Sequence, residues 1–384
     1  MHDVEALFED MRGAIPAGPV KIKEAADSGK KVVGCYCAYT PFEVIRAAGA
    51  VPVSLCSTSD KPIAAGEEHL PRNLCPLIKS SYGFALTDTC PYFHFCDLVI
   101  GETTCDGKKK MYELLDRLRP THVMQLPQTY FGADALNVWR AEIERLARRL
   151  EAELGVTITE DGLRREIKKR NEERRVMQDF YELSKPDPPL LSGRELHLVN
   201  EFFKVSFGDA RAMDTIRELE TKLRENWEAG ERRVPAGRRR IVVTGCPTGK
   251  SLEKVFDAIE ENGGVIVAFE NCGGLKPNYE PADETLPPYE ALAVKYLGIP
   301  CSCMSPNTKR LDLLETLAGE YKADGVVDII LQACHTYSVE SFLVRERLTG
   351  GKRSVPYIPV ETDYSQSDTE QLSTRMGAFM EMIA

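Results

Sequence analysis

Two similar series of apolar and helical segments make up most of this chain, and this repetition restricts its fold more than any other feature. The corresponding segments are apolar runs at 31–37 and 240–246, helical stretches at 42–48 and 251–259, and second apolar runs at 51–56 and 265–272. Gly49 ends the first helical stretch, and Gly263 ends the second. Short apolar runs separated by such helices are typical of parallel β-α-β units. The pattern predicts an α/β fold with two doubly wound, Rossmann-like parallel-sheet domains related by an internal repeat.

The middle of the chain lacks strand patterns. It is rich in Ala, Glu, Arg and Leu, which favour helix, and prolines at 186–189 interrupt it. A further strand is expected in each flanking part, at 122–127 and at 356–361. We therefore expect an N-terminal α/β domain at 1–133, a helical segment at 134–232 and a C-terminal α/β domain at 233–384.

The composition is that of a soluble globular protein. No run of about 18 apolar residues is present that could span a membrane, so no membrane association is expected. The chain has 59 acidic and 49 basic residues, a net charge of -10, which argues against nucleic acid as a partner. The first residues lack the basic and apolar regions of a secretory signal, so a cytoplasmic location is expected.

Six of the twelve cysteines form two matching sets, one in each repeated half. The sets are Cys37, Cys75 and Cys105, and Cys246, Cys303 and Cys334. The last two members are 30 residues apart in the first set and 31 in the second. In a reducing cytoplasm, clustered cysteines are more often metal ligands or catalytic groups than disulfides. The alternative is that they are small buried hydrophobic residues.

The positions of these cysteines favour a shared metal site. Ligands of open α/β sheets bind beyond the carboxyl ends of the strands. Four of the six directly follow an apolar run: Cys37, Cys105, Cys246 and Cys334. Cys75 and Cys303 are each expected to begin a helix, where free N–H groups favour a thiolate. All-thiolate ligation at a domain interface suits an iron–sulfur cluster, and zinc is the alternative, although no compact zinc-finger spacing is present.

The other six cysteines are weaker candidates. Cys56 and Cys272 are the main rivals as ligands. Cys35 and Cys301 fit the spacing less well. Cys90 and Cys96 lack a counterpart in the other half and are expected to be structural.

A glycine-rich stretch at 245–251 resembles a phosphate-binding P-loop. It has one residue fewer between its glycines than the motif requires, and a cysteine occupies the turn. Nucleotide binding is therefore not expected, although the start of the following helix could bind an anion.

Four segments carry more specific motifs: 54–60, 70–82, 101–111 and 331–337. The most specific sequences are Thr-Cys-Asp-Gly-Lys at 104–108 and Gln-Ala-Cys-His at 332–335. Through these motifs nearly the whole chain resembles the 2-hydroxyacyl-CoA dehydratase / benzoyl-CoA reductase family, and most closely its double-cubane cluster branch.

The resemblance implies a cofactor and a partner. Dehydratase subunits of this family hold one [4Fe–4S] cubane through three cysteines, whereas the double-cubane branch holds a sulfide-bridged [8Fe–9S] cluster through six. The two sets match the second case, in which Cys37, Cys75 and Cys105 would hold one cubane and Cys246, Cys303 and Cys334 the other. The resemblance further implies a homodimer that receives low-potential electrons from a homodimeric, ATP-hydrolysing iron–sulfur reductase of the activator type.

The expected function is therefore that of an anaerobic iron–sulfur oxidoreductase that transfers electrons to a small-molecule substrate. His335 and Lys79 are the candidate catalytic residues, and with Asp106 they would supply protons or hydrogen bonds to cluster sulfides. Ordinary surface or helix-cap roles are the alternative for these three residues. The alternative functions are a 2-hydroxyacyl-CoA dehydratase component with one [4Fe–4S] cluster, and a non-catalytic scaffold or redox sensor.

Overall fold

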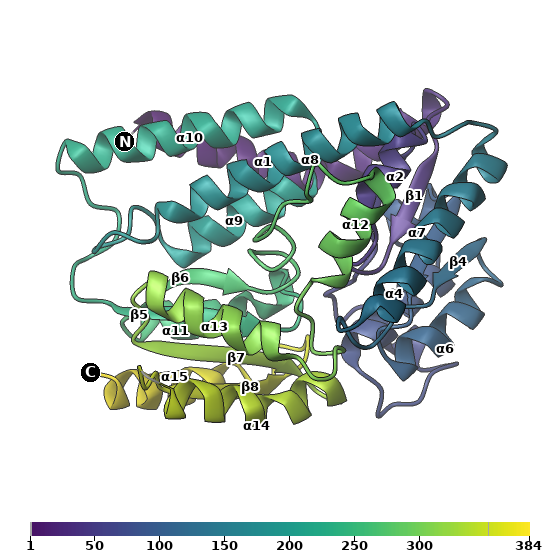
Figure 1. Cartoon of the computed structure of the whole chain (residues 1–384). Helices are drawn as coiled ribbons and strands as arrows, with labels where there is room; N and C mark the ends of the chain where they lie inside the picture. The colour runs from purple at the N-terminus through teal and green to yellow at the C-terminus, as the bar shows by residue number, and fades with distance from the viewer. Residues whose placement is uncertain (1, 352) are drawn as a thin grey trace.

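The computed structural model of the chain describes residues 2–351 and 353–384. Within these residues, two parallel sheets of four strands each form the frame of the molecule (Figure 1). The N-terminal sheet has the strand order β2-β1-β3-β4, and the C-terminal sheet has the order β6-β5-β7-β8. The two sheets share one topology, which confirms the predicted α/β fold with a repeated doubly wound sheet.

The strands lie where the apolar runs predicted them. The N-terminal sheet contains β1 (Val32–Cys35), β2 (Val51–Ser54), β3 (Leu98–Glu102) and β4 (Thr121–Met124). The C-terminal sheet contains β5 (Arg239–Gly245), β6 (Gly264–Glu270), β7 (Gly325–Leu331) and β8 (Tyr357–Thr362). All neighbouring strands are parallel, so their carboxyl ends meet at one edge of each sheet. The strand order reverses between β1 and β3 and between β5 and β7, and such switch points are where ligands bind.

Both halves contain a similar series of helices. The N-terminal half contains α2 (Phe42–Ala47), α3 (Ile63–Gly66), α4 (Pro76–Leu86), α5 (Pro91–His94), α6 (Asp106–Leu115) and α7 (Ala133–Leu154). The C-terminal half contains a short 3-10 turn (Lys250–Leu252), α11 (Glu253–Glu261), α12 (Pro288–Leu297), α13 (Thr308–Glu320), α14 (His335–Gly350) and α15 (Thr369–Met382). α4 packs beside α6 and α2 beside α7; the equivalent pairs are α13 beside α14 and α11 beside α15. However, α12 of the C-terminal half packs against α7 and α8 (Glu160–Glu182) and joins the core of the N-terminal sheet.

A helical layer lies above the C-terminal sheet in Figure 1. It contains α1 (His2–Asp27), α8 (Glu160–Glu182), α9 (Gly193–Lys204) and α10 (Ala210–Glu228). Ser192 begins α9 with a capping box that includes Glu195, because each residue's side chain accepts from the backbone N–H of the other. The described part of 134–232 contains helices and no strand, but the proposed domain boundaries stay a prediction. None of the described helices combines the length and the apolar character that a membrane crossing requires.

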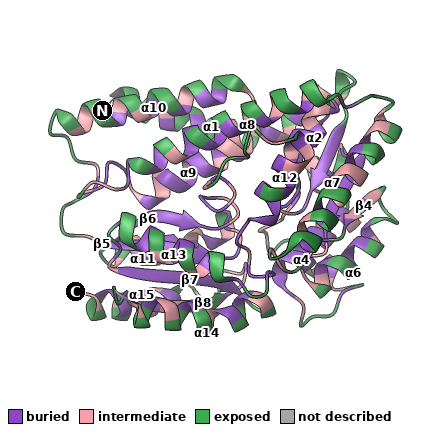
Figure 2. Cartoon of the chain, viewed as in Figure 1, coloured by how far each residue is buried: buried purple, intermediate pink, exposed green. Residues whose placement is uncertain are grey.

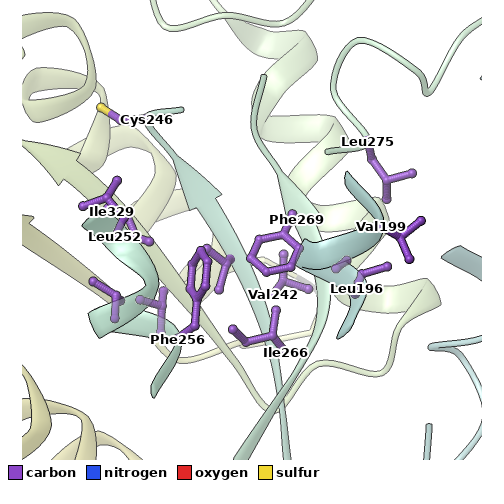
Figure 3. Close-up of a cluster of buried hydrophobic side chains, with 14 of the residues drawn as sticks. Leu196, Val199, Val242, Cys246, Leu252, Phe256, Ile266, Phe269, Leu275 and Ile329 are labelled. Atoms are coloured by element: carbon purple, nitrogen blue, oxygen red, sulfur yellow. The ribbon is translucent and has the colours of Figure 1, made fainter. Parts of the chain in front are cut away.

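Alternate strand residues of the N-terminal sheet enter two hydrophobic cores. Val32 and Val99 face one core, whereas Val33 and Leu98 face the other, as the two-residue period of a strand requires. The first core continues through the helical layer to the C-terminal sheet. Both sheets are buried, and the exposed residues lie on the outer faces of the helices (Figure 2). Figure 3 shows a buried cluster around strands β5, β6 and β7, to which α9 and α11 also contribute side chains, with Cys246 just beyond the end of β5.

A buried ionic contact joins the three parts of the chain. Arg174 of α8 donates to Glu43 of α2 at 2.8 Å, and the Tyr296 hydroxyl of α12 donates to the same carboxylate at 2.6 Å. Burial opposes ionisation of Glu43, but Arg174 and Tyr296 outweigh it and hold the pKa of this carboxyl below its usual range. This contact helps to fix the position of α12, which precedes Cys301 and Cys303.

Candidate functional site

Four of the predicted ligands follow the strands that flank the two switch points. Cys37 follows β1, Cys105 follows β3, Cys246 follows β5 and Cys334 follows β7. Three predicted ligands are helix N-cap residues: Cys75 before α4, Cys105 before α6 and Cys334 before α14. Backbone N–H groups at a helix start stabilise a negative charge. Of these three cysteines only Cys334 has a lowered pKa, because the contact with Cys334 raises the pKa of Cys75 and burial raises that of Cys105.

The prediction that Cys303 begins a helix is wrong. Cys303 lies in a turn, and α13 starts only at Thr308 after the N-cap residue Asn307. The reason is Pro306, because proline disfavours the helical conformation in the residue before it. Cys303 is nevertheless close to another cysteine, since its thiol interacts with that of Cys301.

One group of thiols centres on Cys334, and we call it the Cys334 group. The thiols of Cys246 and Cys75 interact with the Cys334 sulfur more strongly than its other neighbours do. Cys105 is near enough to interact electrostatically with Cys334. Cys75 and Cys105 belong to the N-terminal half, whereas Cys246 and Cys334 belong to the C-terminal half. The group therefore spans both halves of the chain.

A second group, the Cys301 group, contains Cys37, Cys272, Cys301 and Cys303. The thiols of Cys301 and Cys303 interact with one another, and Cys37 interacts electrostatically with Cys272 and Cys301. The Cys303 sulfur lies 3.8 Å from the hydroxyl of Tyr39. This group also combines residues of both halves, because Cys37 follows β1 of the N-terminal sheet.

Each group contains a sulfur that favours the thiolate form. Hydrogen bonds from Cys246 and Cys75 hold the pKa of Cys334 well below its usual range, although burial opposes this. The contact with Cys303 likewise lowers the pKa of Cys301. Burial raises the pKa of Cys37 and Cys246. Thiolates are what soft metals bind, so this chemistry suits metal ligation.

The contacts between the six predicted cysteines do not follow the two sets that the sequence predicted. The direct thiol contacts join Cys75 to Cys334 across the two halves and pair Cys303 with Cys301. Cys272, one of the two main rivals as ligands, and Cys301, which fits the spacing less well, lie within the second group. Among residues 2–351 and 353–384, no three His, Cys, Asp or Glu side chains are arranged to hold a single metal ion.

Lys108 is a site residue to which the sequence pattern assigned no role. Its buried ammonium group donates to the Tyr36 carbonyl at 2.6 Å and interacts electrostatically with Cys37 and Cys56. Lys108 follows Cys105 by three residues on α6, and residues with this spacing lie on one face of a helix. The Thr-Cys-Asp-Gly-Lys motif was therefore the signal that could have identified it.

Two buried tyrosine hydroxyls near the thiols have no hydrogen-bond partner among the described residues. The Tyr364 hydroxyl lies close to Cys75 and Cys246, and the Tyr112 hydroxyl lies close to Lys108. A buried hydroxyl without a partner costs free energy, so each is an available donor. Tyr364 lies beyond β8, and its nearness to the thiols could not be read from the sequence.

The predicted catalytic residues have different surroundings. Lys79 is bound on α4, where its ammonium group donates to Glu67 at 2.7 Å and to the Arg72 carbonyl at 2.8 Å. His335 is exposed at the first position of α14, directly after Cys334. Asp106 is exposed and forms an ion pair with Lys109 at 2.7 Å. His335 is thus the residue whose position best suits exchange of protons with solvent beside the Cys334 group.

Cys90 and Cys96, which were expected to be structural, and also Cys56 and Cys35 have their thiols near backbone groups. The Cys96 thiol donates to the Tyr92 carbonyl at 3.1 Å, and Cys90 accepts from the Phe93 N–H at 3.5 Å. Cys56 donates to the Tyr36 carbonyl at 2.8 Å, which places it beside Lys108. The Cys35 thiol lies 3.6 Å from the Val33 carbonyl inside β1.

The glycine-rich stretch after β5 makes a tight turn that positions Cys246. Gly245 has a φ of +109°, and a Cβ atom there would lie 2.1 Å from the Ile329 carbonyl oxygen of β7. Only glycine fits both this conformation and this space. The turn therefore explains the first glycine of the sequence that resembled a P-loop.

Two repeated α/β domains, with cysteines of both gathered beyond the strand ends, define a two-domain thiol-rich α/β protein. The family described as "2-hydroxyglutaryl-CoA dehydratase, D-component" matches residues 37–383, and the chain belongs to this family.

Similar proteins agree with this assignment. The chain is 49% identical over 381 residues to the "Putative dehydratase subunit YjiM" of Escherichia coli, and the match covers 99% of both chains. It is 24% identical over 402 residues to the "(R)-phenyllactyl-CoA dehydratase beta subunit" of Clostridium sporogenes, covering 100% of both. It is 23% identical over 394 residues to one of the subunits of the benzoyl-CoA reductase of Thauera aromatica, covering 99% of this chain and 96% of the relative.

Proposed function

We propose that this protein is an iron–sulfur oxidoreductase that carries a sulfide-bridged [8Fe–9S] double-cubane cluster. In this proposal a separate ATP-hydrolysing iron–sulfur reductase supplies low-potential electrons, and a homodimer of this chain passes them to a small molecule. The observation that carries the proposal is the gathering of thiols from both halves into two neighbouring groups. The family assignment supports an enzyme of the dehydratase and reductase type.

The residues present fit such a cluster. The donor set consists of thiols, which are the ligands that iron–sulfur clusters use. A cluster of several irons spreads its ligands over more space than a single ion does, which is compatible with two thiol groups that form no single-ion site. The unpartnered hydroxyls of Tyr364 and Tyr112 would find acceptors in cluster sulfides. When bound, the cluster would store and deliver electrons.

The proposed ligands are the two sets of three cysteines. Cys37, Cys75 and Cys105 are proposed for one cubane, and Cys246, Cys303 and Cys334 for the other. Because Cys37 and Cys303 lie in the Cys301 group and the other four lie in the Cys334 group, each cubane would take ligands from both groups. The contacts in the Cys301 group make Cys301 and Cys272 the rivals of Cys303.

The protein side chains around the thiols would hold and move protons. Lys108 places a buried positive charge beside Cys37 and Cys56, which would offset the negative charge of a thiolate-bound cluster. His335 is proposed to donate protons from the start of α14. Lys79 remains a proposed catalytic residue, and its ion pair with Glu67 would have to open for that role.

The second candidate function is that of a dehydratase component with a single [4Fe–4S] cluster. The names of several relatives favour it, because they describe dehydratase subunits acting on 2-hydroxyacyl-CoA compounds. A component of this kind needs only one set of three ligands, so the second set would be dispensable for iron binding.

Iron analysis of single cysteine variants tests the proposal. Cys303→Ser and Cys334→Ser, purified without oxygen, should each lose about half of their iron if six cysteines hold two cubanes. Cys301→Ser is included to decide whether Cys301 or Cys303 is the ligand. Cys96→Ala is the matched control, because its thiol bonds only to a backbone carbonyl. Full iron content in both the Cys303 and Cys334 variants would contradict the double-cubane proposal.

A further inference from the structure

A small pocket with several cationic side chains lies beside the Cys301 group. It has a volume of about 260 Å³ and lies between α12 and α13. Five charged side chains line it: Lys276, Lys295, Lys309, Glu280 and Asp312. Lysines therefore outnumber acids in its wall, although the whole chain has a net negative charge.

Lys295 is the most unusual of these residues. The residue is 5% exposed, and no hydrogen bond or ion pair to its side chain occurs among the described residues. Buried ammonium groups are almost always paired, because removing a charge from water is costly. The charges that act on Lys295 are, in order of strength, Arg174, Glu280, Glu43 and Arg170. Glu43 is already bonded to Arg174 and Tyr296, and no ion pair joins Glu280 to Lys295 among the described residues. Burial and Arg174 lower the pKa of Lys295 to about 7.

The other two lysines differ in whether an acid neutralises them, and Lys309 is the one without an ion pair among the described residues. Lys276 is fully buried and forms an ion pair with Glu270 at 3.1 Å. Lys309 is exposed, and its ammonium group lies 5.1 Å from the centre of the Tyr130 ring. Gly298 makes room for Lys309, because a Cβ atom at this glycine would lie 3.1 Å from the Lys309 nitrogen.

Only a thin wall separates the pocket from the Cys301 group. Ile299 and Pro300 line the pocket and directly precede Cys301 in the chain. Tyr39 donates to the Ile299 carbonyl at 2.8 Å, and its hydroxyl lies 3.8 Å from Cys303. On the other side, Lys276 interacts electrostatically with both Cys272 and Cys301.

The size of the pocket restricts its ligand. Pockets for drug-sized molecules usually have volumes of about 300–1,000 Å³. A volume of about 260 Å³ holds a small oxyanion, but it is too small to enclose a nucleotide or a whole coenzyme A thioester.

We propose that this pocket binds a small oxyanion, of the carboxylate or inorganic oxyanion type, through the ammonium groups of Lys295 and Lys309. The binding itself depends only on the pocket. Its consequence rests on the function proposed above: the bound anion lies next to the Cys301 group and identifies the substrate class of the reductase as small and anionic.

Calorimetric titration of the full chain, purified without oxygen, tests the binding. Sulfate and acetate serve as probes of the two anion types, with chloride added to keep the ionic strength constant. One saturable site per chain is expected for at least one probe. Lys295→Met should weaken that binding by about tenfold or more, because a hydrogen bond to a charged group is lost. Lys168→Met is the matched control, because Lys168 is an exposed lysine on α8, and it should bind like the unmodified chain.

Lys309→Met provides a second variant at an exposed position that is expected to fold normally. It should also weaken binding, whereas the control should not. Equal affinity in all variants, or no saturable binding of either probe, would overturn the proposal. A preference for acetate would assign the carboxylate class, and a preference for sulfate the inorganic oxyanion class.

The pH dependence gives an independent readout with sulfate, which does not titrate near neutrality. The groups facing Lys295 are Arg170 and Arg174 of α8, Glu43 of α2 and Glu280 before α12. A bound anion raises the pKa of Lys295, so binding takes up a proton above pH 7. Affinity should be highest below pH 7 and fall by up to about tenfold per pH unit above it. Affinity that is independent of pH would contradict the role of Lys295.

The iron content of each variant separates this inference from the proposed function. Lys295→Met should keep the iron of the unmodified chain, since Lys295 contacts no proposed ligand. If the unmodified chain held no iron but still bound the anion through Lys295, the pocket would stand, and its link to a cluster would be refuted.

Discussion

Removing the hydroxyl of Tyr364 should change the stability of the fold in opposite directions in the cluster-free and the iron-loaded chain. This hydroxyl is buried beside Cys75, Cys246 and Cys334 and has no partner among the described residues. An unsatisfied buried polar group costs about 1–3 kcal/mol. Tyr364→Phe removes this group and should therefore stabilise the cluster-free chain by about 1–2 kcal/mol. In the iron-loaded protein the hydroxyl would donate to a sulfur atom. The same substitution should therefore lower the free energy of unfolding of the iron-loaded protein by about 1 kcal/mol.

Urea unfolding of the cluster-free and iron-loaded chains, without oxygen and with a thiol reductant, measures both effects. The midpoints are compared between variants whose denaturant slopes are equal. Tyr181→Phe is the matched control, because the buried Tyr181 hydroxyl accepts from Asn200 at 2.9 Å. This control should destabilise both forms by about 1–3 kcal/mol. Destabilisation of the cluster-free chain by Tyr364→Phe would refute the assignment of this hydroxyl as an unpaired donor.

Three further predictions concern the turn at β5, the buried ion pair and the proton donor. Gly245→Ala should destabilise the fold by more than about 3 kcal/mol in urea unfolding, because its φ of +109° and the Ile329 carbonyl exclude a Cβ atom; a change below about 1 kcal/mol would contradict this. Glu43→Gln should cost about 3–5 kcal/mol by leaving Arg174 buried without its anion. Folding lowers the pKa of Glu43, so this residue stabilises the fold at a pH above its unfolded pKa near 4.5. This stabilisation is lost as the pH falls through the folded pKa. If Glu43→Gln lost stability at low pH in the same way as the unmodified chain, the pairing would be contradicted. His335→Gln should keep the iron content and lower the steady-state reduction rate by about 100-fold, and a normal rate would remove His335 from the mechanism.

The fold could be predicted well because its signals are local. The apolar runs and the glycines that end the helices are read within a few residues, and the strands β1 and β5 lie where those runs are. The start of α13 was missed because Pro306 delays the helix after Cys303, which is a constraint of the turn and not of the apolar pattern. The packing of α1 against α9 and α10 left no comparable signal, because that contact links distant parts of the chain.

The candidate site could be predicted only in part. Its cysteines were identified because parallel strands bring their carboxyl ends to one edge, which follows from topology alone. The contact between Cys75 and Cys334 could not be predicted, because it depends on how the two sheets face each other. The same holds for Tyr364, whose neighbours are far away in the sequence. Lys108 could have been predicted in part, since its spacing from Cys105 was visible in the motif.

The most direct test of the central claim is the iron and acid-labile sulfide content of the unmodified chain, purified without oxygen. A double cubane held by both halves predicts about eight irons and about nine sulfides per chain. A content of about four irons and about four sulfides, unchanged in Cys334→Ser, would contradict the claim and favour a single [4Fe–4S] cluster.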